Sequence, residues 1–315
     1  MTQPSRVVTV TAKERAADDV VVVYLAATDG SELPEWMPGA HIDLVLADGL
    51  VRQYSLSGDP CDRSTWRLGI LRDENSRGGS SHIHDKLEAG HKLEIHGPRN
   101  NFALERATRY VFIAGGIGVT PILPMCAEAE LRGASWQLVY GCRSRSSMAF
   151  LEELSNYGSR VTVVPQDEAG LLDLDSLLSD VDDETLVYCC GPEGLLAAVE
   201  ERMKRLAKGA LHVERFRGLP LEEAAWDGSF EVVFEQSGVT CTVEPGQTIA
   251  EVAEDEGVPV MYSCAEGTCG TCETVVLEGI VQHRDSYLDD DQRAAGDRMM
   301  ICVSRSAGPR LVLDL

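Results

Sequence analysis

The distribution of apolar and polar positions changes twice along the 315 residues of this chain. From Val7 to about Leu104, β-branched runs such as RVVTVTAKER, VVVVYLAAT and HIDLVLAD follow one another at short spacing, with turn residues between them. Helical periodicity is scarce in this block, and many short strands separated by turns are typical of a β-barrel. We therefore expect an antiparallel β-barrel domain over residues 1–105.

From Arg109 the pattern becomes a strand followed by a helix, repeated three times. RYVFIAGG precedes a helix started by Pro121, WQLVYGCR precedes SMAFLEELSNYG, and TLVYCCG precedes PEGLLAAVEERMKRLAKG. Alternation of this kind implies a parallel sheet covered by helices. The second block is therefore expected to be an α/β parallel-sheet domain over residues 106–217.

A stretch without periodicity ends this block. RGLPLEEAAWDG mixes proline, glycine and acidic residues, so residues 218–228 are interpreted as an interdomain linker. Beyond it, FEVVFEQSGVTCTVEPGQTIAEVAEDEG predicts a strand hairpin and then a helix, and a cysteine-rich loop follows. A third domain is expected over residues 229–315.

The net charge of the chain limits the classes of molecule that it can bind. The chain has 28 basic and 51 acidic side chains, and its net charge of -23 opposes binding to nucleic acid or to an anionic membrane surface. The surplus is concentrated at the C-terminal end, where residues 229–315 contain 5 basic and 16 acidic residues. A basic protein partner would be attracted, although acidity can also serve only solubility.

The cysteine content points to metal or redox chemistry. No apolar stretch approaches the ~20 residues of a membrane-spanning helix, and the first residues, MTQPSRVVTV, contain no apolar signal region. We therefore expect a cytoplasmic protein, in which ten cysteines favour reduced thiols over a disulfide scaffold.

One short segment, YSCAEGTCGTC, holds three of these thiols in a C-x4-C-x2-C spacing, and a fourth follows after twenty-nine residues. This spacing matches the plant-type [2Fe-2S] centre. Gly267 and Gly270 would let backbone amides point towards the sulfurs. A structural zinc site is the alternative, but the usual second C-x2-C pair is absent. The expected metal ligands are Cys264, Cys269, Cys272 and Cys302.

Residues 229–315 also resemble a plant-type ferredoxin as a whole. The resemblance lies in PGQTIAEVAEDEGVPVMYSCAEGTCGTCETVVLEGIV and in MICVSRS around the fourth cysteine. It implies an α+β fold of the β-grasp type that carries one electron at a time.

The first block contains RQYSLS, which resembles the R-x-Y-S signature of the ferredoxin reductase superfamily, where a barrel strand binds flavin. Arginine can pair with a phosphate, tyrosine can lie against the isoalloxazine, and serine can donate a hydrogen bond near N5. An ordinary barrel strand can hold the same residues, but RGGSSHIHDKL supports the interpretation, because its exposed amides before a short helix suit an anion.

In the phthalate dioxygenase reductase family, which this block resembles, the latter segment and the end of the preceding strand hold the FMN phosphate. No additional segment is dedicated to an adenosine, so FMN is favoured over FAD. The expected flavin-binding residues are Arg52, Gln53, Tyr54, Ser55, Leu71, Arg72, Arg77, Gly78, Gly79, Ser80 and Ser81.

The second block contains FIAGGIGVTPIL, a strand, a glycine turn and a helix that would present free amides to a pyrophosphate. Together with CCGPEGLL it resembles the two-motif nucleotide domain of the same superfamily. Arg143 and Arg145 follow the second strand, where a 2′-phosphate could be held, and no acid that would favour a free hydroxyl is evident there. Solvated arginines are the alternative. NADPH therefore stays possible, while the resemblance favours NADH. The resemblance implies nucleotide contacts at Gly115, Gly116, Thr120, Arg143, Cys190, Gly191 and Pro192, with Phe216 of HVERF stacked over the flavin.

The order of flavin, nucleotide and ferredoxin blocks resembles the single-chain reductases of Rieske oxygenase systems, of the phthalate dioxygenase and vanillate O-demethylase type. Nicotinamide gives two electrons at once and an iron-sulfur centre accepts one, so a flavin is needed between them. The resemblance implies a terminal oxygenase as electron acceptor and Ser55, Thr120, Cys190 and Phe216 as catalytic residues. A reductase for a P450 monooxygenase, a redox-sensing protein without turnover and a zinc-stabilised interaction module are the alternatives.

Overall fold

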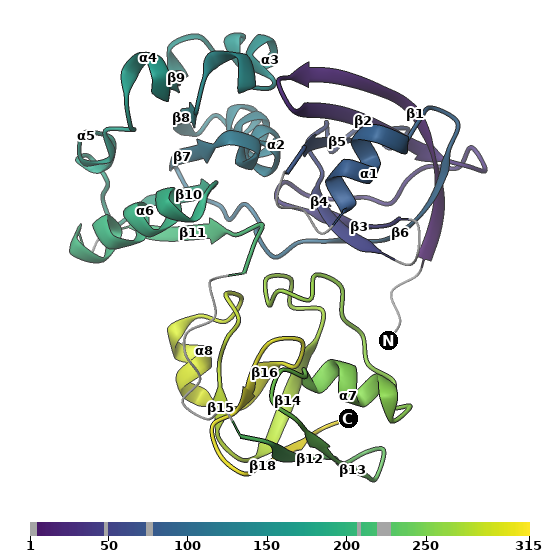
Figure 1. Cartoon of the computed structure of the whole chain (residues 1–315). Coiled ribbons are helices and arrows are strands. Elements are labelled where there is room, and N and C mark those ends of the chain that lie inside the picture. The colour runs from purple at the N-terminus through teal and green to yellow at the C-terminus, as the bar shows by residue number, and fades with distance from the viewer. Residues whose placement is uncertain (1–4, 47–49, 74–77, 207–208, 219–227) are drawn as a thin grey trace. The chain divides into compact units, whose positions relative to one another are not determined.

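The computed structural model describes residues 5–46, 50–73, 78–206, 209–218 and 228–315 (Figure 1). The chain divides into two compact units, of which the first ends at Glu214 and the second runs from Arg215 to Leu315. The expected barrel and nucleotide sheet both belong to the first unit. Arg77 and most of the expected linker lie outside the described residues.

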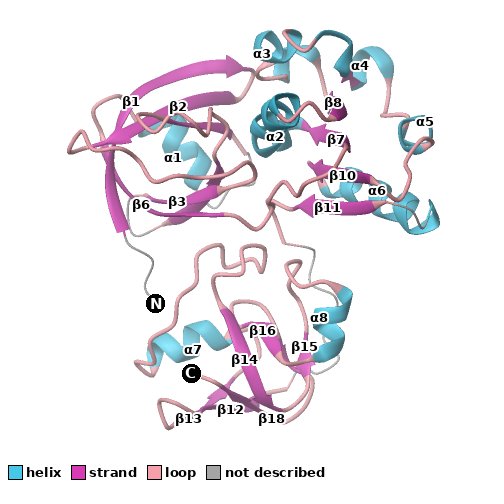
Figure 2. Cartoon of the chain, turned by 180° about the vertical axis from the view of Figure 1, so that it is seen from behind, coloured by secondary structure: helices cyan, strands magenta, loops and turns pink. Residues whose placement is uncertain are grey.

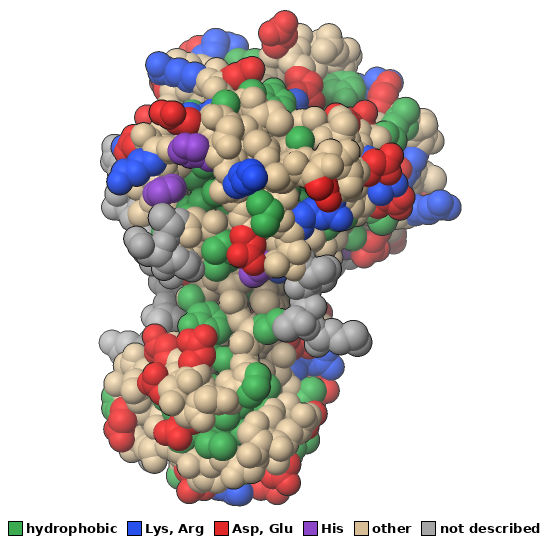
Figure 3. All heavy atoms as spheres, turned by 90° about the vertical axis from the view of Figure 1, so that its right-hand side faces the viewer, with side chains coloured by type: hydrophobic (Ala, Val, Ile, Leu, Met, Phe, Trp, Pro, Cys, Tyr) green, Lys and Arg blue, Asp and Glu red, His purple; other side chains and the backbone are tan. Residues whose placement is uncertain are grey.

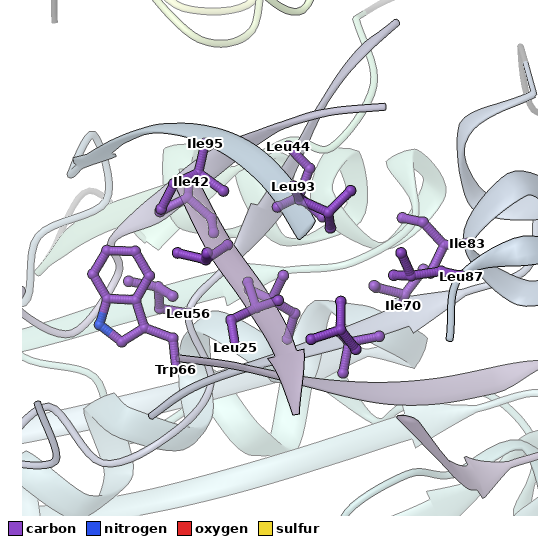
Figure 4. Packing of buried hydrophobic residues seen from close by; sticks show 14 of the residues in the cluster. Leu25, Ile42, Leu44, Leu56, Trp66, Ile70, Ile83, Leu87, Leu93 and Ile95 are labelled. Carbon is purple, nitrogen blue, oxygen red and sulfur yellow. The ribbon is translucent and has the colours of Figure 1, made fainter. Parts of the chain in front are cut away.

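The first sheet is a six-stranded antiparallel barrel with the strand order β4-β3-β6-β1-β2-β5. An antiparallel bridge between Leu56 and Leu68 joins its two outer strands. Helix α1 (Gly79–Lys86) packs Ile83 into the barrel core, which Figure 4 shows with Trp66 among aliphatic side chains. The strands are β1 (Ser5–Ala17), β2 (Val20–Ala27), β3 (His41–Val45), β4 (Val51–Ser55), β5 (Trp66–Leu71) and β6 (Lys92–Arg99).

The second sheet has five parallel strands in the order β11-β10-β7-β8-β9, as expected for the α/β block. From β7 the chain moves outwards through β8 and β9 and then returns to the other side of β7 for β10 and β11. The carboxyl ends of β7 and β10 therefore flank the point where the strand order reverses, which is where open α/β sheets bind ligands. The strands are β7 (Arg109–Gly115), β8 (Ser135–Cys142), β9 (Val161–Pro165), β10 (Thr185–Cys190) and β11 (Ala210–Glu214).

Helices cover this parallel sheet, and α2 (Val119–Leu131) begins earlier than expected. We expected its start at Pro121, but a 3-10 turn, Gly116–Gly118, leads directly into it, and proline is tolerated in a first helical turn. The helices that complete this unit are α3 (Leu151–Ser155), α4 (Gln166–Ala169), α5 (Leu174–Leu178) and α6 (Glu193–Leu206), with 3-10 turns at Arg145–Ser147 and Gly158–Arg160.

The barrel and the parallel-sheet domain pack so closely at Gly69 of β5 that no side chain would fit at this position. A Cβ at Gly69 would lie 2.7 Å from Thr120 Cγ2 and 3.1 Å from Phe150 Cζ. Beside this contact, Arg67 pairs with Glu153 at 2.7 Å and its guanidinium lies 5.0 Å from the centre of the Phe150 ring. Thr120 is thus held against a barrel strand, which explains why these two predicted domains form one compact unit.

The second unit is an α+β domain with the sheet order β13-β12-β18-β14-β16 (Figure 2). Strand β12 pairs with β13 in antiparallel and with β18 in parallel register, as in a β-grasp. Thr248 caps α7 reciprocally with Glu251. The elements are β12 (Phe230–Phe234), β13 (Val239–Val243), α7 (Ile249–Asp255), β14 (Glu273–Glu278), β15 (Val281–Gln282), α8 (Asp290–Ala295), β16 (Arg298–Met300), β17 (Arg305–Ser306) and β18 (Arg310–Leu313).

The three expected architectures, barrel, parallel sheet and ferredoxin-like domain, are confirmed. Among the helices of the described segments, none combines the length and the apolarity that crossing a bilayer requires.

Candidate redox and nucleotide sites

The two glycine motifs of the parallel sheet touch each other through their backbones. A Cβ at Gly115 would lie 2.6 Å from Pro192 Cδ, and a Cβ at Gly191 would lie 2.9 Å from Gly115 Cα. A Cβ at Gly118 would likewise collide with the carbonyl of Cys190. The ends of β7 and β10 therefore form a floor built of backbone, and the turn before α2 can present its amides above it.

Thr120 follows Gly118 by two residues and Cys190 directly precedes Gly191, and both are buried. The Thr120 hydroxyl donates to the carbonyl of Ile117 at 2.9 Å, so its methyl group is the part that faces Gly69 of the barrel. The predicted nucleotide residues Gly115, Gly116, Thr120, Cys190, Gly191 and Pro192 thus lie together at the β7 and β10 ends, and Arg143 is exposed just beyond β8.

The structure adds Glu214, which we did not predict, to this group. Its carboxyl group forms a hydrogen bond with Ser55 of the barrel strand β4 and lies 4.0 Å from the Cys190 sulfur. Burial raises the pKa of Glu214 to about 8, and it raises the pKa of the Cys190 thiol as well. Near neutral pH both groups therefore keep their protons.

Glu214 belongs to the same HVERF segment that suggested Phe216. The feature that could have identified Glu214 is a carboxylate at the end of the last strand of the parallel sheet. We considered only the aromatic residue of this motif. Phe216 itself lies in the second unit and is 41% exposed, so its predicted stacking on a flavin stays a prediction.

The residues predicted to hold a flavin phosphate surround the beginning of α1. A Cβ at Gly79 would lie 2.5 Å from Arg52 Cγ, which places the Arg52 side chain directly against this helix. Ser80 is buried, and its hydroxyl accepts from the backbone amide of Asp73 at 3.1 Å. Arginine beside a helix N-terminus combines two features that favour an anion.

Several predicted flavin residues form contacts within the protein, and Arg52 itself donates from Nη1 to the carbonyl of Val51 at 2.7 Å. Arg72 forms a bidentate pair with Asp85 of α1, at 2.6 and 2.9 Å. Gln53 donates to Asp43 at 3.1 Å, and Asp43 is paired with Arg99 in a nearly buried salt bridge. These contacts favour structural roles for Gln53 and Arg72. The remaining predicted residues, Tyr54, Ser55, Leu71, Gly78 and Ser81, lie on β4, at the end of β5 or at the start of α1.

In the second unit the four predicted thiols lie next to one another in a chain. Cys264 forms hydrogen bonds with Cys269 and with Cys302, and Cys302 also forms one with Cys272. The thiols of Cys269 and Cys302 lower the pKa of Cys264. In the described part of the chain no three His, Cys, Asp or Glu side chains converge as ligands of one metal ion. Four cysteine thiols are the ligand set of a plant-type [2Fe-2S] cluster.

Backbone amides of the loop point at the sulfurs, as expected from its glycines. The amides of Glu266 and Thr268 donate to Cys264 Sγ at 3.4 and 3.5 Å, and that of Thr271 donates to Cys269 Sγ at 3.5 Å. Such hydrogen bonds stabilise negative charge on sulfur and tune the potential of an iron-sulfur centre.

A segment distant in sequence holds this loop in shape. The amide of Ser286 donates to the carbonyl of Gly267 at 3.0 Å, and a Cβ at Gly270 would collide with the ring of Tyr287. The preceding Asp285 is buried and accepts hydrogen bonds from the amides of Tyr287 and Leu288. This support was not visible in the cysteine spacing.

Comparison with known proteins agrees with this geometry. The model of the oxidoreductase NAD-binding domain matches residues 112–201, and the model of the 2Fe-2S iron-sulfur cluster binding domain matches residues 232–307. The solved structure of phthalate dioxygenase reductase superposes with a TM-score of 0.75 at 33% identity, covering 99% of this chain and 98% of that one. The chain belongs to the phthalate dioxygenase reductase family.

Two curated relatives of similar length support this membership. A phenoxybenzoate dioxygenase subunit beta from Ectopseudomonas oleovorans is 42% identical over 301 residues, which cover 95% of this chain and 94% of that protein. A vanillate O-demethylase oxidoreductase from a Pseudomonas species is 38% identical over 315 residues, covering 98% of this chain and 99% of that protein. This reductase-family chain is accordingly an oxidoreductase with an NAD-binding and a 2Fe-2S domain.

A solved P450 protein also contains a similar segment. An intact type IV self-sufficient cytochrome P450 monooxygenase superposes on 99% of this reductase-family chain with a TM-score of 0.89 and 44% identity, but the match covers only 41% of that longer chain.

Proposed function

We propose that this chain is the reductase component of a Rieske-type oxygenase system, in which electrons pass from NADH through FMN and a [2Fe-2S] cluster to a separate terminal oxygenase. The observation that carries the proposal is the presence of two features in one chain. The first is the pair of glycine motifs around Gly115 and Gly191 that touch through their backbones at the ends of β7 and β10, which we call the nucleotide crevice. The second is a group of four adjacent thiols. A bound flavin would supply the conversion of a two-electron donor into a source of single electrons.

Arg52 and the start of α1 are the proposed site of the FMN phosphate. The Arg52 side chain lies against Gly79, and the first amides of α1 are not used within the helix. Tyr54 and Ser55 follow on the same strand and would contact the isoalloxazine. Arg72, bound to Asp85, would act by fixing α1 rather than by contacting the phosphate.

Cys190, Ser55 and Glu214 are the proposed groups around the point of hydride transfer. Ser55 comes from the barrel and the other two from the parallel sheet, so they mark where a flavin and a nicotinamide can meet. Because the Cys190 thiol and the Glu214 carboxyl keep their protons near neutral pH, they would line this point without a fixed negative charge. Thr120 would position α2 against the barrel.

Cys264, Cys269, Cys272 and Cys302 are the proposed ligands of the cluster. Three of them are at least 96% buried, since only 4%, 3% and 3% of Cys269, Cys272 and Cys302 is exposed. The loop amides would hold the cluster sulfurs in a defined electrostatic environment. The acidic surface of this unit, of which Figure 3 shows one side, would attract a basic patch on the oxygenase.

The proposal is tested by anaerobic titration of the purified protein with NADH. We expect a yellow-brown protein whose flavin and iron-sulfur absorbance are both bleached, followed by reduction of cytochrome c. Protein without iron and without flavin, which takes up neither on reconstitution, would contradict the proposal. Bleaching without acceptor reduction would instead favour the redox-sensing alternative.

Electron delivery to a cytochrome P450 is the second candidate function, and the similarity to the self-sufficient P450 favours it. The two candidates differ only in the acceptor. Reduction rates with a purified Rieske oxygenase and with a purified P450 monooxygenase, measured under the same conditions, would distinguish them, and faster reduction of the P450 would reverse our choice.

A further inference from the structure

The ends of three neighbouring strands place an ion pair beside the nucleotide crevice. Gly115 of β7 pairs with Gly141 of β8, and Cys142 of β8 pairs with Pro165 of β9. The turns that follow these strands therefore share one edge of the sheet, with neighbouring strands about 4.8 Å apart. In dinucleotide-binding folds the segment after the second strand meets the ribose 2′ position, where an acid suits a free hydroxyl and an arginine suits a 2′-phosphate.

Arg145 follows the second strand, β8, but its guanidinium is already bound. Its Nε donates to Glu168 Oε1 at 3.0 Å and its Nη2 to Glu168 Oε2 at 2.8 Å. Both partners are charged, because Glu168 raises the pKa of Arg145 and Arg145 lowers the pKa of Glu168. This fork geometry is the one that an arginine would offer to a phosphate.

Glu168 is held in this place by the fold. It lies on the short helix α4 directly after β9, and the backbone amide of Asp167 donates to the carbonyl of Arg143 at 3.1 Å. This bond ties α4 to the β8 turn. Asp167 adds a second negative charge near Arg145. The positive charges of Arg143 and Arg145 are therefore balanced by the negative charges of Asp167 and Glu168. These four residues together offer no net positive charge to a 2′-phosphate.

We propose that Glu168 is a specificity-determining residue, which occupies Arg145 and thereby selects NADH against NADPH. A 2′-phosphate would have to displace the Glu168 carboxylate from Arg145 and would then lie close to it. A free 2′-hydroxyl has no charge and can donate to a carboxylate. This inference rests on the proposed function, because it concerns the electron donor of the same reaction.

The test compares the holoprotein with its Glu168→Gln variant. The kcat/KM values for NADPH and NADH in cytochrome c reduction give the preference, and calorimetric titration with adenosine 2′,5′-bisphosphate and with AMP gives affinities without turnover. We expect both the NADPH/NADH ratio and the affinity for the bisphosphate to rise about tenfold, as removal of one nearby charge predicts. AMP affinity should stay unchanged, because the amide oxygen introduced in the variant can accept the same hydrogen bond from a 2′-hydroxyl.

Glu201→Gln is the matched control, because Glu201 pairs with Arg205 on the exposed side of α6 at 3.1 Å and carries the same charge. We expect no change of preference in this control. Adding Arg145→Ala to Glu168→Gln should abolish the gain, since the freed guanidinium is what binds the phosphate.

The proposal is overturned if the unaltered protein prefers NADPH, or if Glu168→Gln leaves both the ratio and the bisphosphate affinity within about twofold, well below the tenfold expected for one charge. If the unaltered protein oxidises neither nucleotide, the proposed function is wrong. The bisphosphate affinities then decide the role of Glu168 alone, with tighter binding by the variant supporting it and equal binding refuting it.

Discussion

The iron-sulfur site and the nucleotide crevice differ in the groups that form them: side chains in the first and backbone in the second. At the iron-sulfur site the functional groups are four side chains, three of which lie within nine residues of one loop. In the crevice, Gly115 ends β7 and Gly191 follows β10, 76 positions later in the chain, and both act by having no side chain. A site made of ligands is therefore visible in the sequence as a spacing, whereas a site made of backbone appears only as scattered glycines.

Removal of a ligand should have the largest effect and is expected to separate the two units functionally. In Cys302→Ser we expect cytochrome c reduction with NADH to fall by about a hundredfold or more, because a cluster needs all four thiolates. Ferricyanide reduction, which can draw on the flavin, should stay within about twofold, since the crevice is unchanged. Steady-state assays with the two acceptors measure this difference.

Cys241→Ser is the control for this variant, because Cys241 lies on β13 and is not among the four adjacent thiols. It should keep both activities. Equal loss of both activities in Cys302→Ser would show that the two sites are not separable in this way.

Adding a single methyl group should damage the crevice. In Gly115→Ala the new Cβ would lie 2.6 Å from Pro192 Cδ, so the two motifs must move apart. We expect a loss of about 1–3 kcal/mol in unfolding free energy and a higher KM for NADH. Denaturant unfolding and steady-state kinetics measure these changes.

Gly194→Ala supplies the contrast, because nothing lies within 4 Å of a Cβ at this position in α6. Alanine should be neutral or stabilising in a helix. If both variants behave alike, the backbone contact is not what builds the crevice.

Glu214 should make the stability of the first unit depend on pH. Its folded pKa of about 8 lies above the usual value of 4.5, so between these pH values the native state keeps a proton that the unfolded state has released. Stability therefore falls as pH rises through this window, by at most about 1.4 kcal/mol per pH unit. Glu214→Gln removes the titrating group.

Urea unfolding at pH 5.5 and pH 8.5 tests this expectation about Glu214. The unaltered protein should lose stability at the higher pH, and the Gln variant should lose less. An identical pH dependence in the two proteins would mean that the pKa of Glu214 is not raised in the folded protein. No comparable prediction applies to the thiols of the second unit, whose protons are displaced when a metal binds.

Ionic strength should have the smallest effect and should act on one unit only. We expect reduction of the partner oxygenase to slow several-fold from low to high salt, because acidic residues outnumber basic ones 16 to 5 in residues 229–315. Reduction of the flavin by NADH serves as the internal control. Stopped-flow rates of partner reduction that do not change with salt would contradict electrostatic steering.

The sequence predicted the three architectures because each depends on a local period. Short alternating runs gave the barrel strands, and strand-helix alternation gave the parallel sheet. The start of α2 at Val119 instead of Pro121 shows the usual limit of such reasoning, because a 3-10 turn has no strong signal of its own. The boundary between the first two predicted domains is not a boundary between compact units, since Gly69 and Thr120 interlock across it.

The candidate sites also contain residues that motifs predicted and contacts that only the structure revealed. Arg52 and the glycines at the start of α1 were predicted from motifs, while the pairing of Arg72 with Asp85 required knowing that β5 ends beside α1. Glu214 was overlooked because its partners, Ser55 and Cys190, lie 159 and 24 positions away in the chain. A carboxyl group acquires a raised pKa from surroundings that the sequence does not place next to it.

By itself, then, the sequence determined the kinds of domain, their order, and the four thiols, since short-range periodicity and ligand spacing are properties of neighbouring residues. Only the tertiary structure decided which backbones touch at the crevice, which arginine is already bound by a carboxylate, and which acid keeps its proton. These properties depend on distances and burial between residues far apart in the chain, and such distances are set by packing.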